Sequence, residues 1–117
     1  SDRGIFFSPP MAKPAFEKLA QVLKTDGLSD FDKNYLIKQA AERNYFTCHQ
    51  VNSLIRVMSA LESTSANRRG VAITLYKRTT DSANFAKVAL SEDVMKEADR
   101  EMVMDEVNAK GKRKPKK

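Results

Sequence analysis

The stretch from Tyr45 to Val51 constrains the fold of this chain more than any other. Thr47 and Gln50 have the spacing of a capping box, in which each side chain bonds the other residue's backbone N–H at a helix start. Phe46 and Val51 have the spacing of a hydrophobic staple across that start. An apolar stripe with helical spacing then follows: Val51, Leu54, Ile55 and Met58. The pattern predicts a helix from about residue 48 to 61 that buries one face.

Similar start signals and stripes predict five further helices along the chain. Pro14 suits a first helical turn, and Gly27 supplies the stop of that helix. Ser29 and Asp32 are an N-cap pair, and the helix after them is apolar on a wide arc that includes Tyr35, as expected of an inner helix. Ser91 is a further N-cap. Gly70 is a weak point unless a neighbouring helix packs closely against it. The expected helices span about 14–23, 30–43, 66–78, 82–90 and 91–107.

The start signals recur with a fixed offset. Asp81, Asn84 and Phe85 lie 34 residues after Thr47, Gln50 and Val51, respectively. A repeat of about this length indicates stacked helical hairpins. We therefore expect an all-α fold of five or six helices, arranged as antiparallel hairpins in a short right-handed stack. The period is that of tetratricopeptide repeats, but their tryptophan, leucine-glycine and tyrosine signature is absent.

These motifs resemble those of a small all-helical family that is catalogued only as a domain of unknown function. Phe46, Thr47, Gln50 and Val51 match its first helix start, and Asp81, Asn84 and Phe85 match a later one. The resemblance covers roughly residues 15–105. It implies a fold and no activity, because the matching positions are caps and core.

Proline content and charge divide the chain into three parts. Residues 1–13 are a proline-punctuated lead-in that we expect to be flexible, and residues 14–107 form the helical domain. The net charge of +6 resides in a basic tail, 108–117, which we expect to be disordered, so residues 1–107 sum to zero. The last expected helix is acidic, since residues 91–107 carry two basic and seven acidic side chains.

No set of side chains predicts catalysis, a cofactor or a metal. Cys48 and His49 are adjacent, and adjacent helical residues do not face each other. A zinc site needs about four such ligands, and this chain has one cysteine and one histidine. The carboxylates after residue 91 lack the loop of a calcium site, so a solvated helix face is the better interpretation.

The residues that could face a partner are basic or aromatic. Lysine and arginine can bind phosphates or acidic surfaces, and the tail also has the spacing of a nuclear-import element. The candidate basic residues are Lys110, Lys112, Arg113, Lys114, Lys116 and Lys117 in the tail, with Arg68, Arg69, Lys77 and Arg78 on the fourth helix. The candidate partner contacts are Phe6 and Phe7, and a solvated tail and a disordered lead-in are the alternatives.

The methionines divide into core and surface candidates. Met58, Met95 and Met102 are expected in the core. Val103 and Met104 lie around the last helix from Met102, which predicts either a partner-binding face or a frayed helix end.

Together these patterns favour a monomeric, non-enzymatic module that binds another protein. A nucleic-acid-associated role through the tail is the alternative. No apolar run approaches the ~20 residues of a membrane span, and a single cysteine suits an intracellular location, cytoplasmic or nuclear. Thr47, Gln50, Asp81, Asn84 and Ser91 are expected to act as structural caps only.

Overall fold

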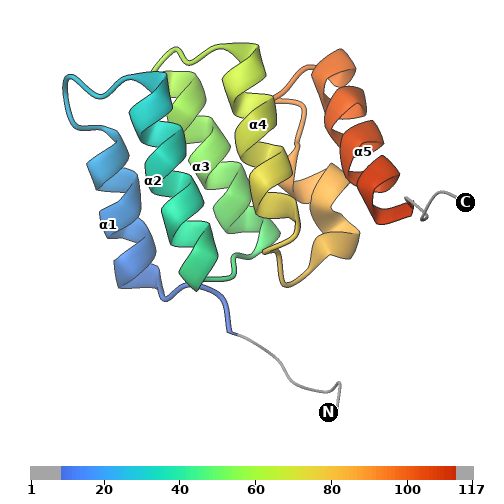
Figure 1. The fold of residues 1–117 in the computed structure, drawn as a ribbon, viewed down its shortest axis with the longest axis horizontal. Coiled ribbons are helices and arrows are strands. Elements are labelled where there is room, and N and C mark those ends of the chain that lie inside the picture. Colours follow the sequence, from blue (N-terminus) through green and yellow to red (C-terminus); the bar gives the residue numbers. More distant parts are fainter. Residues whose placement is uncertain (1–8, 113–117) are drawn as a thin grey trace, which may run out of the picture.

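The fold is all-helical in the part of the chain that the computed structural model describes, residues 9–112, with side chains through residue 109. Consecutive helices run in alternating directions (Figure 1). Residues 9–112 contain no strand, although two isolated bridges join loop segments. The elements are α1 (Lys13–Leu23), α2 (Asp30–Arg43), α3 (Cys48–Ala60), α4 (Ser65–Tyr76), the 3₁₀ turn η1 (Ser82–Asn84), the π-helical turn η2 (Phe85–Ala89) and α5 (Glu97–Lys112).

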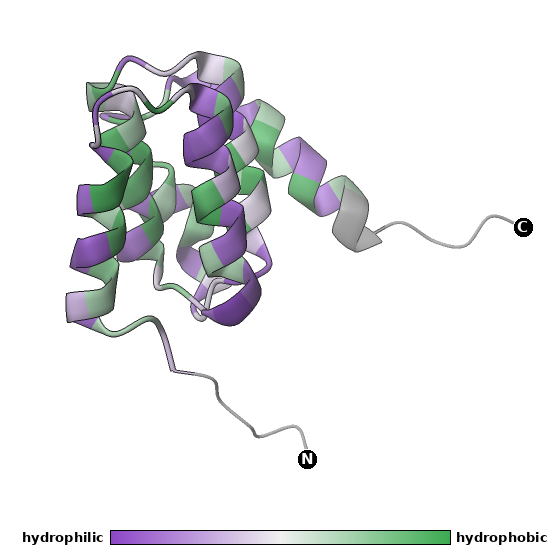
Figure 2. Ribbon diagram, turned by 60° about the vertical axis from the view of Figure 1, so that its left-hand side comes forward, coloured by the Kyte–Doolittle hydropathy of each residue, from purple (hydrophilic) through white to green (hydrophobic). Residues whose placement is uncertain are grey.

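The helices form two layers. In one layer α4 packs against both α2 and α5, and in the other α3 packs against both α1 and η2. Hydrophobic and hydrophilic bands alternate around the helices, as expected when each buries one side (Figure 2). The centre of the core is fully buried and includes Leu23, Phe46, Val51, Leu54, Ile55, Met58, Leu75, Phe85, Leu90 and Val103.

The helix starts are fixed by local side chains. Thr47 Oγ1 accepts a hydrogen bond from the Gln50 N–H at 3.1 Å, and Gln50 Oε1 accepts one from the Thr47 N–H at 3.0 Å. Ser29 and Asp32 make the same reciprocal pair before α2. Thr64 caps α4 by accepting from the Asn67 N–H at 3.1 Å. These caps satisfy backbone donors that the first helical turn leaves without a partner.

Segments about 34 residues apart lie side by side where α1, α3 and η1 begin. The Met11 N–H donates to the Tyr45 carbonyl at 2.7 Å, and the Phe46 N–H donates to the Arg78 carbonyl at 2.8 Å. The two isolated bridges, Pro10 with Tyr45 and Phe46 with Thr79, are both parallel. Segments separated by about the period of the sequence motifs are thus joined by backbone hydrogen bonds.

The expected helix over 82–90 is a 3₁₀ turn followed by a π-helical turn, and Asp81 does not cap it. The Asp81 carboxylate instead accepts a hydrogen bond from the Cys48 N–H in the first turn of α3. The Leu90 N–H reaches back five residues to the Phe85 carbonyl at 3.1 Å. This wider turn is compatible with the complete burial of Phe85, Ala89 and Leu90.

Ser91 does not cap the last helix either, because α5 begins six residues later at Glu97. The Ser91 carbonyl accepts from the N–H groups of Val94 and Met95, which forms a turn that buries both side chains. The Ser91 hydroxyl is engaged by Asn52 of α3 at 2.8 Å. At its other end α5 extends to Lys112, beyond the expected boundary at 107 and into the segment that we expected to be a disordered tail.

Two side chains expected in the apolar interior are exposed. Tyr35 on α2 is 53% exposed, and Met102 on α5 is 52% exposed. Val103 and Val107, four residues apart on α5, are buried instead. Met58 and Met95 lie in the core as expected.

Candidate functional site

A hollow on the described surface lies between α2, α4 and the end of α5. Its volume is about 780 Å³, and a second hollow of about 400 Å³ adjoins it between α2 and α4. Lys38 and Thr74 line both hollows, so the two hollows adjoin, and we treat them together as one groove. We call this feature the α2–α4 groove.

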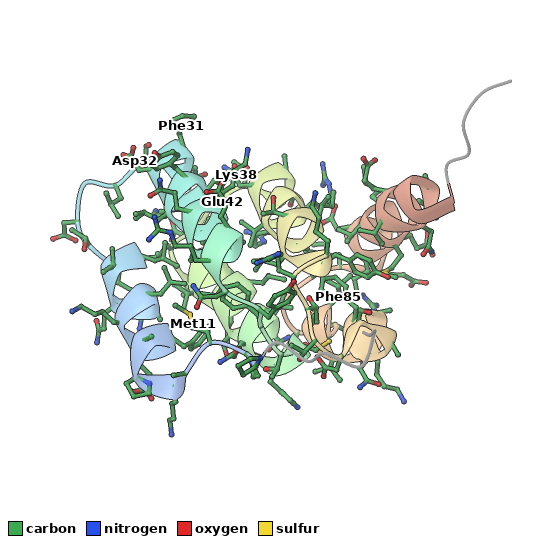
Figure 3. All side chains as sticks on the ribbon, turned by 60° about the horizontal axis from the view of Figure 1, so that its bottom comes forward. Met11, Phe31, Asp32, Lys38, Glu42 and Phe85 are labelled. Atoms are coloured by element: carbon green, nitrogen blue, oxygen red, sulfur yellow. The ribbon has the colours of Figure 1, made fainter. Side chains whose placement is uncertain are left out.

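One face of α2 forms the first wall of the groove. Phe31, Tyr35, Lys38 and Glu42 are spaced by four, three and four residues, which places them on one side of a helix. Figure 3 shows Phe31, Lys38 and Glu42 following one another along α2. Phe31 is 77% exposed, so two aromatic side chains lie uncovered at the end occupied by the smaller hollow.

Helix α4 provides the opposite wall, and α5 closes one end. Ile73 and Tyr76 are half-buried against the core, and Val107 of α5 is buried. They make an apolar floor together with Ala41 of α2. Gly70 lines the smaller hollow, and a Cβ added there would meet no atom within 4 Å. The close helix packing that would explain this glycine is therefore absent.

The groove carries a net positive charge. Lys38, Lys77 and Arg78 line it together with a single carboxylate, Glu42. Neither lysine has an ion-pair partner within the described part of the chain. Arg78 is fixed in place, because its guanidinium lies 4.1 Å from the Tyr45 ring centre and its Nε donates to the Asn44 carbonyl at 3.2 Å.

The other predicted basic residues of α4 have internal partners. Arg69 forms an ion pair with Asp99 of α5 at 2.6 Å, and both side chains are largely buried. Arg68 donates to the Ser63 carbonyl. The four basic residues of α4 and its C-terminal end therefore do not form one free surface, and only Lys77 and Arg78 lie in the groove.

The remaining candidates lie outside the described side chains. These are Phe6, Phe7, Lys110, Lys112, Arg113, Lys114, Lys116 and Lys117. For Lys110 and Lys112 the structure gives only the backbone, as the last residues of α5.

Thr47, Cys48, Gln50 and Asp81 lie together at the start of α3, and none of them lines the groove. Thr47 and Gln50 cap α3, and Gln50 Nε2 also donates to the Met11 carbonyl at 2.9 Å. Cys48 is buried, and burial together with the nearby Asp81 raises the pKa of its thiol to about 12. A thiol with so high a pKa carries almost no thiolate at neutral pH, and His49 beside it is exposed.

Metal binding and membrane crossing find no support in the described residues. Nowhere among the described side chains do three or more His, Cys, Asp or Glu residues gather in a way that could hold a metal ion. No helix between residues 9 and 112 combines the length and apolar character that crossing a bilayer requires.

Comparison with known proteins identifies the family. Residues 10–105 match the family model described as Domain of unknown function (DUF4476). The chain belongs to this family. No curated protein and no solved structure is significantly similar to it. The DUF4476 match begins where the bridged segment before α1 begins and ends within α5, so it includes the whole α2–α4 groove except Val107.

Sequence reasoning missed the groove of this DUF4476 domain. Phe31 was not singled out, and Tyr35 was assigned to the interior. A usable signal was present, because α2 carries one stripe at Lys33, Ile37 and Ala41 and a second at Phe31, Tyr35, Lys38 and Glu42. Only the first stripe is buried.

Proposed function

We propose that this protein is a non-enzymatic module that binds a segment of another protein in the α2–α4 groove. The observation that carries the proposal is the exposed aromatic pair Phe31 and Tyr35 beside a hollow with an apolar floor. Concave sites with apolar walls and a few polar groups are typical of binding sites, and exposed aromatic residues are enriched at interfaces.

The proposal includes a repeat architecture. The pairs α1–α2, α3–α4 and η2–α5 would be three units of a short right-handed stack, in which α2, α4 and α5 present one common face. The supporting observation is that matched loop segments bond at offsets of 32 to 34 residues, as between Met11 and Tyr45 and between Phe46 and Arg78. A common face of stacked helices offers an extended surface to a partner.

Selection from a displayed library of short random peptides tests the function. Thr74 lines both hollows, so Thr74→Tyr should obstruct the whole groove. The matched control is Ser53→Tyr, since Ser53 is exposed on α3 in the other layer. We expect peptides selected on the wild-type chain to lose binding to the Thr74 variant and to retain it with the control. Equal binding to both variants, with circular dichroism showing both folded, would overturn the proposal.

The alternative is a nucleic-acid-associated role driven by the tail. About six phosphate contacts would give binding to duplex DNA with a log–log salt slope of roughly −5. This role predicts that deleting residues 110–117 abolishes the salt-dependent binding and that Thr74→Tyr has no effect on it. Arg68 and Arg69 have internal partners, so they would not extend the basic surface of the tail in such a role.

A further inference from the structure

We infer that the segment bound in the α2–α4 groove is acidic and carries an apolar anchor residue. This inference rests on the proposed function and adds the chemical class of the partner. It follows from the distribution of charge and apolar surface inside the groove.

Two lysines supply most of the positive charge that a bound segment would meet. Lys38 is exposed where the two hollows meet, and Lys77 is exposed across the groove from α2. Neither has a carboxylate partner among the described residues, so their charges are available to a ligand. Arg78 adds a third positive charge that is already oriented by the Tyr45 ring. Complementary charge accelerates association and selects against partners of the wrong sign.

The floor of the groove between these charges is apolar. The floor contains Ala41, Ile73 and Val107, and it offers no charged group to a ligand. An apolar side chain placed there would remove its own surface and that of the floor from water. This burial is the main source of binding free energy in such sites. The anchor therefore belongs between acidic residues that reach Lys38 and Lys77.

The length of the groove suits a short segment. α2 has 14 residues and so extends about 21 Å. An extended chain spans that distance with about six or seven residues. Phe31 and Tyr35 at the far end supply further contact area for a side chain of the same segment.

The groove suits a nucleic acid less well, although it is basic and has aromatic residues beside it. Single-stranded nucleic acids need cations that follow the phosphate backbone. The cations of this groove are instead gathered at the larger hollow, since the smaller one is lined by no charged side chain except Lys38. A short segment with a few acidic residues can meet such a cluster, whereas a phosphate backbone would continue past it without partners.

The experiment compares Lys38→Glu/Lys77→Glu with the control Lys18→Glu/Lys87→Glu. Lys18 and Lys87 are exposed on α1 and η2, so the control makes the same change in net charge in the other layer. The probes are the library peptides whose binding depends on Thr74, their forms with Asp and Glu replaced by Asn and Gln, and a mixed-sequence single-stranded oligonucleotide. Binding is measured by fluorescence anisotropy at low and high ionic strength, with circular dichroism as the check of folding.

We expect the selected peptides to be acidic, with an aliphatic or aromatic residue among the acids. Their affinity should fall at least about tenfold in the groove variant, fall with salt, and stay unchanged in the control. Neutral or basic peptides, or peptides indifferent to the charge reversal, would overturn the inference and leave the proposed function intact. Failure to select any peptide that depends on Thr74 counts against both. Displacement of the peptides by the oligonucleotide at lower concentration than by the amidated peptides would assign the groove to nucleic acid instead.

Discussion

The backbone N–H of Cys48, in the first turn of α3, donates a hydrogen bond at 2.9 Å to the carboxylate of Asp81, which lies 33 residues further along the chain. The Cys48 Sγ–H donates to the Asp81 carbonyl at 3.2 Å. Asp81 therefore acts as a cap for a helix in the preceding hairpin. One residue joins the start of α3 to the segment that leads into η1.

Replacing Asp81 by Ala should lower the free energy of unfolding by about 1–2 kcal/mol, because a first-turn N–H loses its charged acceptor. Thr47→Ala should cost about 1 kcal/mol at the same helix start. Urea unfolding of both variants measures these losses. Ser82→Ala, a change at an exposed position, is the control and should cost almost nothing. A loss at Asp81 no greater than that of the control would show that this bond does not stabilise the fold.

The same contact should make stability depend on pH. Burial of Asp81 opposes its ionisation, but hydrogen bonds from Cys48, its own backbone and Asn84 outweigh burial and lower its pKa below the ordinary 3.8. A carboxyl with a lowered pKa stabilises the folded state fully above the pKa of the unfolded chain. That contribution disappears as the pH falls through the folded-state pKa. Thermal unfolding between neutral pH and about pH 3 should therefore show a smaller acid-induced loss in Asp81→Asn than in the wild type.

Cys48 should resist alkylation while the chain is folded. Its pKa of about 12 is raised by burial first and by Asp81 second, so the thiolate is scarce at pH 8. Iodoacetamide should modify the thiol in urea and leave it unmodified in buffer, as measured by mass spectrometry. Rapid modification without denaturant would contradict the buried position of this residue.

Two ion pairs allow a matched comparison of burial. Arg69 and Asp99 join α4 to α5, and their side chains are 25% and 16% exposed. Arg56 and Asp93 are at a similar distance, 2.9 Å, but are 54% and 58% exposed. Double-mutant cycles to Ala should give a coupling of about 1–3 kcal/mol for the first pair and a much smaller one for the second, which water and salt screen. Equal coupling in the two pairs would mean that the Arg69–Asp99 ion pair contributes little to the packing of α4 against α5.

Gly70→Ala should stabilise the protein by up to about 1 kcal/mol. The reason is that a Cβ at this position of α4 meets open space and relieves the conformational cost of glycine in a helix. Differential scanning calorimetry should show a higher melting temperature. A lower one would indicate a close contact at Gly70 that the structure does not contain.

The parts of this fold that depend on neighbouring residues could be predicted from the sequence. Thr47 with Gln50 and Ser29 with Asp32 cap their own helices, because both partners lie within one turn. The family and the all-helical fold were likewise expected. Asp81 and Ser91 were assigned to the wrong helix starts, because their partners, Cys48 and Asn52, lie 33 and 39 residues away.

The candidate site depended on distant residues as well. The groove is lined by side chains of α2, α4 and α5, and no local pattern predicts which helices become neighbours. The two stripes of α2 can be read from its sequence, but which of them another helix covers depends on residues outside α2, so Tyr35 was assigned to the interior. The acidic residues of α5 were interpreted as a solvated helix face, which is a local explanation. Asp99 instead forms an ion pair with Arg69 of α4, a partner that no local pattern indicates.

Several of the hydrogen bonds described above join different hairpins, and their sequence separation affects how the chain folds. The hydrogen bonds that side chains make with distant segments close loops of 30 to 39 residues. None of these hydrogen bonds joins α1 to α5. The entropy of loop closure rises only slowly with length, so each of these contacts costs about the same to form. A contact between α1 and α5 would close a longer loop, and a larger mean sequence separation of contacts slows folding. We therefore expect that the core can begin to form at any of these contacts, without α1 and α5 having to meet first.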